Sequence, residues 1–370
     1  MASCLKSKII KLFFVYLPVF LILCLIAIVY CAYIFTYITF LINPVEQPNI
    51  YPFSHTATPE SGKRRGIILL SIVTFFFFLT FTSMLRVIFM DPGYVPSPLE
   101  LEYKIIQKNI NPKVEKNRAF RQNYKNFNNQ IKEGPLTSTE KNKIIKSLDF
   151  KNPVPPIDEE SISLLVKEND PFNKYINMDF SKVLLCGSCL RWKVERAHHC
   201  RQCGKCVLKM DHHCPWLGTC IGFRNYKYFL LLQLHGLIST TIVFFTLIEA
   251  LINHNMNENT NLLTLILLLF GWVCDGGLFA FLLWLFCINW RLMFRGETVI
   301  ENSDKQRFPS NNTPNIYDLG PYKNFTSVFG TNPLIWFFPI LPNYKGEGVV
   351  YEINDSFDVE KIRENPFSGI

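Results

Sequence analysis

Residues 186–220 read CGSCLRWKVERAHHCRQCGKCVLKMDHHCPWLGTC. This stretch holds seven of the 12 cysteines and four of the seven histidines in the chain. A disulfide framework would not explain so many histidines in one window. Mixed cysteine and histidine at short spacing instead indicates metal binding in a reducing compartment. The repeated Cys-x2-Cys spacing provides the close thiolate pairs that suit tetrahedral zinc.

The number of candidate ligands in this stretch predicts two zinc ions. A closed structural zinc site takes four ligands. If Cys214 is set aside, the stretch keeps six cysteines, and two histidines would bring the ligands to eight. The spacing alone leaves open which two of the four histidines bind metal: His198, His199, His212 and His213.

The same spacing argues against nucleic acid as a partner. A two-histidine finger needs a cysteine pair followed by two histidines that lie three to five residues apart. Cys186 and Cys189 are followed by His198 and His199, which are adjacent. A nucleobase deaminase would carry a His-x-Glu motif before a Pro-Cys-x-x-Cys run, and the sequence has no such glutamate.

Four apolar runs outside this stretch are each long enough for a membrane-spanning helix, which needs about 20 residues. They cover residues 10–41, 66–90, 228–251 and 262–290. A secretory signal is the alternative for the first run, but the apolar core of such a signal is only about 7–15 residues long. Asp91-Pro92-Gly93 ends the second run, because proline and glycine are poor helix residues.

The placement of lysine and arginine predicts the orientation of these spans. Basic residues precede the first span, crowd the segment between the second and third, and follow the fourth, whereas the loop 252–261 has none. We therefore expect both termini and the central segment in the cytosol. Lys63, Arg64 and Arg65 disagree, because they would lie on the lumenal side, where long side chains could reach the headgroups.

These features divide the chain into five parts. We expect spans one and two in residues 1–93, a polar and partly disordered cytosolic linker in 94–181, the cysteine-rich domain in 182–227, spans three and four in 228–290, and a cytosolic tail in 291–370. The tail contains a second apolar stretch, residues 333–341, which is too short to span a bilayer. Its aromatic residues suit either the membrane interface or packing against the zinc domain.

Several motifs together resemble the DHHC protein S-acyltransferases. Asp91-Pro92-Gly93 matches the family after span two, and the cysteine-rich run matches throughout. Asn225 and Phe229 match at the entry to span three. In the tail, Thr298-Val-Ile-Glu301 resembles the family's Thr-Thr-x-Glu, with Val299 in place of its second threonine, and residues 324–330 resemble its asparagine motif. The resemblance covers most of the chain except residues 94–182.

The resemblance implies a fold and a set of zinc ligands. Family members are all-α membrane proteins with four transmembrane helices and a cytosolic double-zinc domain between helices two and three. Their first zinc site corresponds to Cys186, Cys189, His199 and Cys206. Their second zinc site corresponds to Cys200, Cys203, His213 and Cys220.

The residues left outside these sites suit acyl transfer through Cys214. A cysteine nucleophile must be a thiolate, and a neighbouring histidine can take its proton or stabilise its charge. In an extended segment residues two apart share a side, so His212 would face Cys214 while His213 turns toward zinc. Asp211 would orient His212, as a carboxylate does in a catalytic triad, provided that the chain turns there.

The resemblance also implies the substrates. The family transfers a fatty acyl group from acyl-coenzyme A to membrane-proximal cysteines of protein substrates, through an acyl-enzyme. Coenzyme A carries phosphates, which arginine and lysine bind well; the alternative partner is an anionic lipid surface. Trp216 corresponds to a family position near the thioester, although simple packing would also explain it. The candidate coenzyme A residues are therefore Trp216, Arg191, Lys193 and Arg196, with Lys205 and Lys209 close by.

Two other functions remain to be compared with the enzyme. A catalytically silent zinc-containing membrane scaffold would need only His213 of the four residues 211–214. A channel or transporter would draw support from Glu249 and Asp275, which fall in or near spans, although such proteins usually show more spans. For the location, we expect the Golgi or another endomembrane, the commonest address in the family.

Overall fold

The computed structural model describes two compact units of the chain. Unit 1 comprises Met1–Pro92, Asp211–Tyr344 and Ile353–Ile370, and unit 2 comprises Gly93–Met210 and Lys345–Glu352. Within them the structure describes residues 59–95, 186–189, 191, 193–255, 262–307, 315–342, 348–349 and 351–357, together with scattered positions from 17 to 38. The predicted first span and the predicted linker therefore lie almost entirely outside the described residues.

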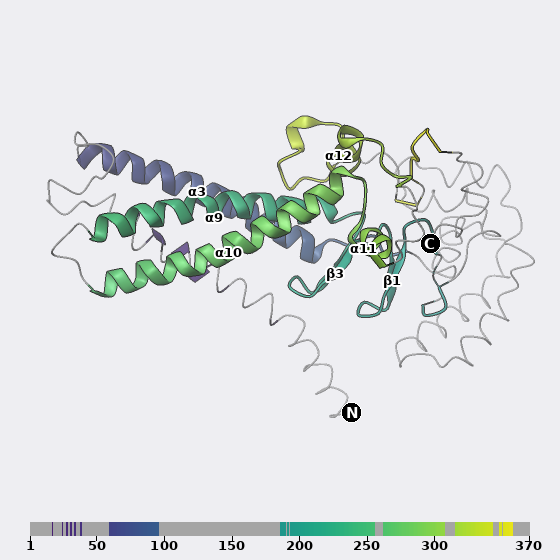
Figure 1. Ribbon diagram of the computed structural model, residues 1–370, viewed down its shortest axis with the longest axis horizontal. Helices are drawn as coiled ribbons and strands as arrows, with labels where there is room; N and C mark the ends of the chain where they lie inside the picture. The colour runs from purple at the N-terminus through teal and green to yellow at the C-terminus, as the bar shows by residue number, and fades with distance from the viewer. Residues whose placement is uncertain are drawn as a thin grey trace, which may run out of the picture. The chain divides into compact units, whose positions relative to one another are not determined.

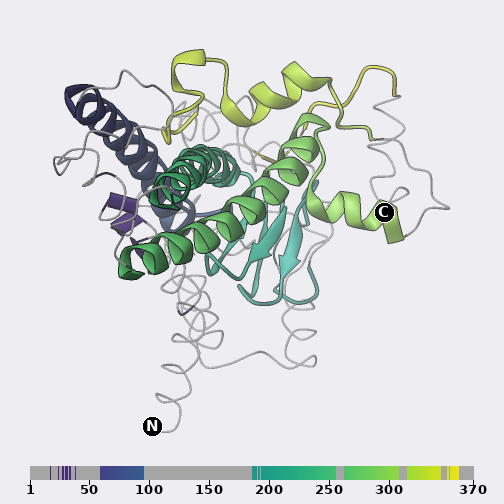
Figure 2. The ribbon, with the colours of Figure 1, turned by 60° about the vertical axis from the view of Figure 1, so that its left-hand side comes forward.

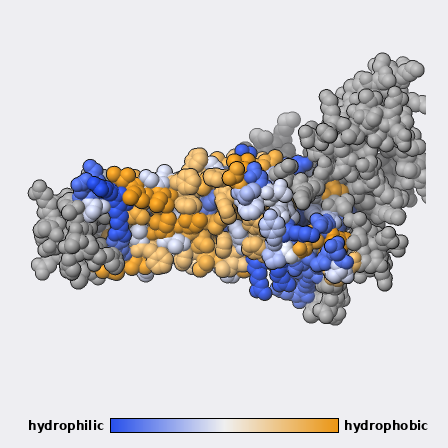
Figure 3. Space-filling view, turned by 90° about the horizontal axis from the view of Figure 1, so that it is seen from above, coloured by the Kyte–Doolittle hydropathy of each residue, from blue (hydrophilic) through white to orange (hydrophobic). Residues whose placement is uncertain are grey.

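Unit 1 is built on three long helices, which are α3 (Pro59–Phe89), α9 (Tyr226–Asn255) and α10 (Leu262–Phe294). They lie side by side, with α9 packed against both α3 and α10 (Figures 1 and 2). All three are long and apolar enough to cross a membrane, and apolar side chains cover the middle of the bundle in Figure 3. These three helices support a membrane protein.

Helix α3 begins at Pro59, which is seven residues before the predicted span, because its first turns are polar but still helical. Those turns contain the basic residues that disagreed with the predicted orientation. Arg64 donates to Glu60 one turn earlier, at 2.7 Å. Arg65 forms a two-pronged ion pair with Glu249 of α9, at 2.6 and 2.5 Å. Two of the three positive charges are therefore paired with acidic residues of the same unit.

The cysteine-rich region forms two short antiparallel ribbons, which the all-α prediction did not include. In unit 2, β1 (His198–Cys200) pairs with β2 (Lys205–Val207). In unit 1, β3 (His212–Cys214) pairs with β4 (Thr219–Ile221). Gly204 and Gly218 follow the first strand of each ribbon with φ of 65° and 63°, which a side chain rarely tolerates.

A buried asparagine ties β4 to the start of α9 and the end of α3. The amide oxygen of Asn225 accepts from the Gly222 N–H at 2.9 Å. Its amide nitrogen donates to the carbonyls of Cys220, at 2.9 Å, and Val87, at 3.3 Å. Since Asn225 is fully buried, these bonds explain why the position directly before α9 requires an amide.

The tail of unit 1 packs beside this region. Helix α11 (Val299–Arg307) follows α10 after a glycine turn, and α12 (Pro321–Phe329) packs on the end of α10. One hydrophobic cluster joins Cys214 to the ends of the helices and to α12. Its other buried members include Phe229 of α9, Trp290 of α10 and Phe329 of α12.

Candidate active site and metal centres

The first predicted zinc site is assembled within unit 2. The ligand atoms of Cys186, Cys189, His199 and Cys206 all lie within 4.8 Å of one another. The register of β1 and β2 places His199 opposite Cys206. The sulfurs of Cys189 and Cys206 are 3.6 Å apart, close to the ~3.8 Å expected when each thiolate lies about 2.3 Å from one tetrahedral zinc.

The hydrogen bonding of the thiols and of the histidine ring in this set also suits a metal site. The contact between the two sulfurs lowers the pKa of the Cys189 thiol and raises the pKa of the Cys206 thiol, so the pair shares a proton that a cation can replace. The Nδ1 atom of His199 is buried and has no hydrogen-bond partner among the described residues. Thiolate and imidazole donors in this number favour zinc.

The second predicted set consists of two close pairs, one in each unit. In unit 1 the register of β3 and β4 brings His213 opposite Cys220, and the Cys220 sulfur lies 3.6 Å from His213 Nδ1. In unit 2 the Cys203 N–H donates to the Cys200 sulfur at 3.4 Å. Each pair can provide two ligands, so the described residues contain two sets of cysteine and histidine that could hold metal ions.

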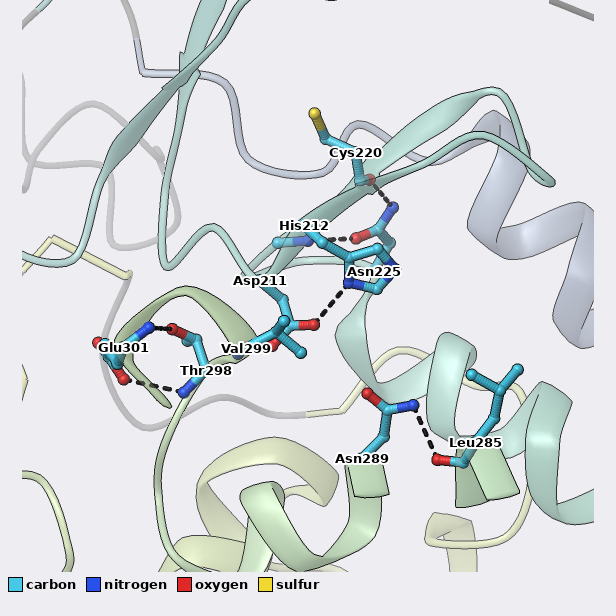
Figure 4. A network of polar contacts seen from close by, with 10 residues as sticks. Asp211, His212, Cys220, Asn225, Leu285, Asn289, Thr298, Val299 and Glu301 are labelled. Atoms are coloured by element: carbon cyan, nitrogen blue, oxygen red, sulfur yellow. Dashed lines mark hydrogen bonds and ion pairs between the residues drawn. The ribbon is translucent and has the colours of Figure 1, made fainter. Parts of the chain in front are cut away.

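Asp211 is the most enclosed residue of the DHHC run. It precedes β3, and its N–H extends the ribbon by donating to the Ile221 carbonyl at 2.9 Å. The carboxylate is 1% exposed and accepts two hydrogen bonds. One comes from His212 Nδ1 at 2.7 Å, and the other comes from the Val299 N–H at 3.0 Å (Figure 4). The contact between Asp211 and His212 that the predicted triad requires is therefore present.

His212 is held between Asp211, Cys214 and an aromatic ring. Its ring meets Phe229 of α9 edge-on, with centroids 5.2 Å apart. Burial opposes the charged form, but hydrogen bonds to Asp211 and Cys214 outweigh it and raise the pKa of His212 to about 9. The raised pKa favours the protonated imidazolium form of His212 at neutral pH.

Cys214 lies at the end of β3 and belongs to neither set of metal ligands. It is 6% exposed and is part of the cluster that includes Leu217 and Phe229. Its sulfur is therefore shielded from bulk water on the side of the helices, where an apolar substrate would be favoured.

The Thr298–Glu301 motif forms a reciprocal cap at the start of α11. The Thr298 N–H donates to Glu301 Oε2 at 2.8 Å, and the Glu301 N–H donates to Thr298 Oγ1 at 3.2 Å (Figure 4). This is a capping box, and it aims the Val299 N–H at Asp211. This capping role was not predicted from the sequence, although the Thr-x-x-Glu spacing before a helix was a usable signal.

The predicted coenzyme A residues are spread over both units. Trp216, in unit 1, is 52% exposed and lies two residues after Cys214. In unit 2 the Arg191 guanidinium donates to the Val95 carbonyl. Arg196 lies over the Tyr351 ring, at 5.1 Å from its centroid, and Lys193 is exposed. Arg191 and Arg196 therefore have structural contacts of their own, and a shared phosphate site stays a prediction.

Comparisons with known proteins agree with this geometry. Residues 180–306 match the family model described as DHHC palmitoyltransferase. The chain is 33% identical to human palmitoyltransferase ZDHHC20 over 163 residues, which cover 44% of each protein. It is 34% identical to zebrafish palmitoyltransferase ZDHHC20-A over 166 residues, covering 45% of this chain and 46% of the relative.

A plant relative extends the match. The chain is 34% identical to the Arabidopsis thaliana probable protein S-acyltransferase 14 over 209 residues, which cover 52% of this chain and 66% of the relative. The matches cover 44 to 66% of the length of these relatives. Residues 180–306, which match the family model, contain both ribbons, the DHHC run and α9. The family model and these relatives agree that residues 180–306 form a DHHC palmitoyltransferase domain.

Proposed function

We propose that the protein is an S-acyltransferase that moves a long-chain acyl group, such as palmitoyl, from acyl-coenzyme A to protein cysteines. Cys214 is the nucleophile, His212 is the acid and base, and Asp211 orients His212. The observation that carries this proposal is the chain of contacts from the Val299 N–H through the buried Asp211 carboxylate to His212. The metal ligands leave Cys214 out, so its sulfur is available for chemistry.

The first half-reaction forms the acyl-enzyme. The Cys214 thiolate attacks the thioester carbonyl of acyl-coenzyme A, a new carbon–sulfur bond forms, and the bond to the coenzyme A sulfur breaks. The departing thiolate takes the proton that His212 holds. The Asp211 carboxylate keeps Nδ1 as a donor, so that Nε2 is the nitrogen left for this proton transfer.

The second half-reaction reverses the roles. A cysteine thiol of the protein substrate gives its proton to His212 and attacks the acyl carbonyl on Cys214. Cys214 leaves as a thiolate beside the imidazolium, which restores the starting state. Each step exchanges one thioester for another, so the reaction needs little driving force.

The two zinc ions would be structural. The first would be held by the four ligands of unit 2, and the second by the pairs Cys200–Cys203 and His213–Cys220 together. A site closed by four protein ligands leaves no open position for a substrate. Zinc at His213 and Cys220 would instead stiffen the β3–β4 ribbon, which carries His212 and Cys214 one residue to either side of a ligand.

The bilayer or the helical bundle would hold the acyl chain away from water. We propose four spans, with both termini and the zinc domain on the cytosolic side, in the Golgi or another endomembrane. Burying about 14 methylenes at ~0.8 kcal/mol each favours the bilayer or the helical bundle by roughly 11 kcal/mol over water.

Phosphates of coenzyme A would meet Arg191, Lys193 and Arg196, and Trp216 would lie near the thioester. The protein substrates would carry cysteines close to the membrane.

A silent scaffold is the alternative function, and a pulse–chase experiment separates the two. The purified full-length protein is incubated with labelled palmitoyl-coenzyme A, freed of excess reagent, and mixed with a cysteine peptide. We expect hydroxylamine-sensitive label on the protein that moves to the peptide, no label on Cys214→Ser, and normal label on Cys287→Ser, which removes an exposed cysteine of α10. A parent protein that takes up no label would favour the scaffold.

A further inference from the structure

Residues 333–341, which follow α12, present the largest concentration of exposed apolar side chains in the described tail. This segment, called here the tail loop, begins with a short 3-10 turn, η4 (Pro333–Ile335). Leu334 is 80% exposed and Phe337 is 51% exposed, and three neighbours are also exposed: Phe338, Ile340 and Leu341. Such a patch on a short segment marks a surface that something apolar covers.

The backbone of the tail loop is fixed to α9 by a buried lysine. Lys227 is fully buried, and its ammonium donates to the carbonyls of Ile335, at 2.8 Å, and Ile340, at 3.0 Å. A buried ammonium is costly unless its donors are satisfied. Lys227 therefore holds both ends of the turn 335–340 together and against the first turn of α9.

A histidine farther along α9 makes a similar contact with the tail loop. The His235 Nε2–H donates to the Phe337 carbonyl at 3.0 Å. On its other side, His235 Nδ1 lies 3.5 Å from Ser83 Oγ of α3. His235 is nine residues beyond Tyr226, where α9 begins, which is about 13 Å along a helix. The tail loop thus runs beside the apolar part of α9, as the yellow tail does in Figures 1 and 2.

The hydrogen bonding of the tail loop suits surroundings without water. Polar backbone groups inside a bilayer must be satisfied by the protein itself. The carbonyls that point to α9 are satisfied by Lys227 and His235. Two of the nine residues are prolines and have no N–H. Among the other seven N–H groups, five donate to acceptors within 332–338: those of residues 334, 335, 336, 338 and 340.

The side chains of the tail loop are sorted by polarity in the same way. The one side chain with a strong donor, Trp336, points inward. Its Nε1–H donates to the Gly330 carbonyl at 2.8 Å, and its ring packs edge-on against Phe325 of α12 at 5.0 Å. Leu334, Phe337 and Phe338, which have no polar atoms, point outward.

From these observations we infer that the tail loop is a re-entrant membrane anchor. Its outward side chains are embedded in the acyl chains of the lipid leaflet that surrounds the first turns of α9. Lys227 and His235 are the positioning residues that hold it at this depth. Because Trp336 packs against the cluster that contains Cys214, the anchor keeps the nucleophile beside the lipid.

A photocrosslinking experiment tests the lipid contact directly. The full-length protein carries a benzophenone amino acid at Leu334, at Phe338 or at the exposed Ser356, and is placed in phosphatidylcholine nanodiscs and irradiated. We expect lipid adducts, identified by mass, at positions 334 and 338 and none at 356. Adducts confined to the protein chain, or no adduct at 334 and 338, would overturn the inference.

Matched lysine variants test whether Lys227 positions the tail loop. We expect Lys227→Met to reduce lipid adducts at position 338 several-fold, and Lys227→Arg, which keeps the donors, to retain most of them. Lys323→Met serves as the control, because Lys323 is exposed on α12, and it should leave the adducts unchanged. Equal adduct yields in Lys227→Met and the parent would show that Lys227 does not position the tail loop. If Lys227→Met loses its zinc and does not fold, the crosslinks of the parent protein still test the lipid contact. The positioning of the tail loop is then tested by comparing the yield of lipid adducts in Lys227→Arg with the yield in His235→Phe.

Discussion

At the scale of single residues, the site depends on how one carboxylate is held. Asp211 accepts from the side chain of the neighbouring His212 and from the backbone of α11. Both oxygens are therefore occupied in a buried position, which keeps His212 in the orientation that the proposed acyl transfer requires. The family's second threonine is valine here, and Val299 contacts Asp211 through its backbone N–H, which does not depend on the side chain.

Substitutions at Val299 test this backbone contact. Val299→Thr should leave the rate of acyl-enzyme formation within about twofold, since the N–H is unchanged. Val299→Pro removes the N–H at the first residue of α11, where proline is compatible with a helix. A buried acceptor left without its donor costs about 1–3 kcal/mol, so we expect the rate to fall roughly tenfold or more. Equal rates in the two variants, measured by rapid quench with palmitoyl-coenzyme A, would contradict the role of the contact.

The residue scale also shows where sequence reasoning reaches its limit. The roles proposed for His212 and Cys214 followed from residue type and from the two-residue spacing of an extended segment. The Val299 contact could not be predicted, because a backbone N–H is present whatever the side chain. The sulfur contact of Cys189 and the ring contact of Phe229 likewise depend on folding that brings distant positions together.

At the scale of elements, α11 supports the Asp211 carboxylate through the Val299 N–H. Its capping box satisfies N–H groups that a helix start otherwise leaves unpaired. A change in the position of α11 would therefore affect Cys214 through Asp211 and His212.

The capping box can be weakened without touching the DHHC run. Glu301→Ala should cost ~0.5–2 kcal/mol of stability and slow acylation, because α11 would start less regularly. Glu301→Gln keeps an acceptor at the same place and should retain most of the stability and rate. Thermal unfolding and acylation are measured in parallel. If Glu301→Ala matches Glu301→Gln in both, the capping box does not support the site.

A second element-level prediction concerns the pair between α3 and α9. Glu249→Gln would leave Arg65 without its partner in a partly buried position, where its side chain is 45% exposed. Since that exposure weakens the interaction, we expect a loss on the order of 1–2 kcal/mol and a lower Tm. The matched control is Glu60→Gln, which breaks an ion pair whose side chains are both 75% exposed and should change Tm little.

The elements differ in how well the sequence predicted them. Helices α3, α9 and α10 overlap the predicted spans 66–90, 228–251 and 262–290, because about 20 apolar residues leave a strong signal. The hydropathy signal marks only the apolar part, so the polar first turns of α3 were missed. The strands of the ribbons have three residues each, which is too short for a period-two pattern to stand out.

At the scale of the whole molecule, metal binding and folding are expected to be coupled. The small ribbons bury few apolar residues, and their cysteines and histidines take the place of a core. Orientation, the first span and the polar linker stay predictions, since they depend on residues outside those that the structure describes.

Zinc removal tests this coupling. We expect about two zinc ions per chain by elemental analysis, and chelation should release both together with loss of ribbon structure. Cys206→Ser should lower the zinc content by one ion and abolish acylation. A chain that keeps its ribbons by hydrogen exchange after complete removal of zinc would contradict a structural role for the metal.

The central claim is that Cys214 is free of metal and carries the acyl group. Its most direct test measures zinc content and acylation on the same preparation of Cys214→Ser. The proposed arrangement predicts that this variant keeps as much zinc as the parent, while peptide mapping finds the palmitoyl group on Cys214 of the parent and nowhere in the variant. A variant that loses zinc, or that still forms the palmitoyl adduct, would contradict the claim.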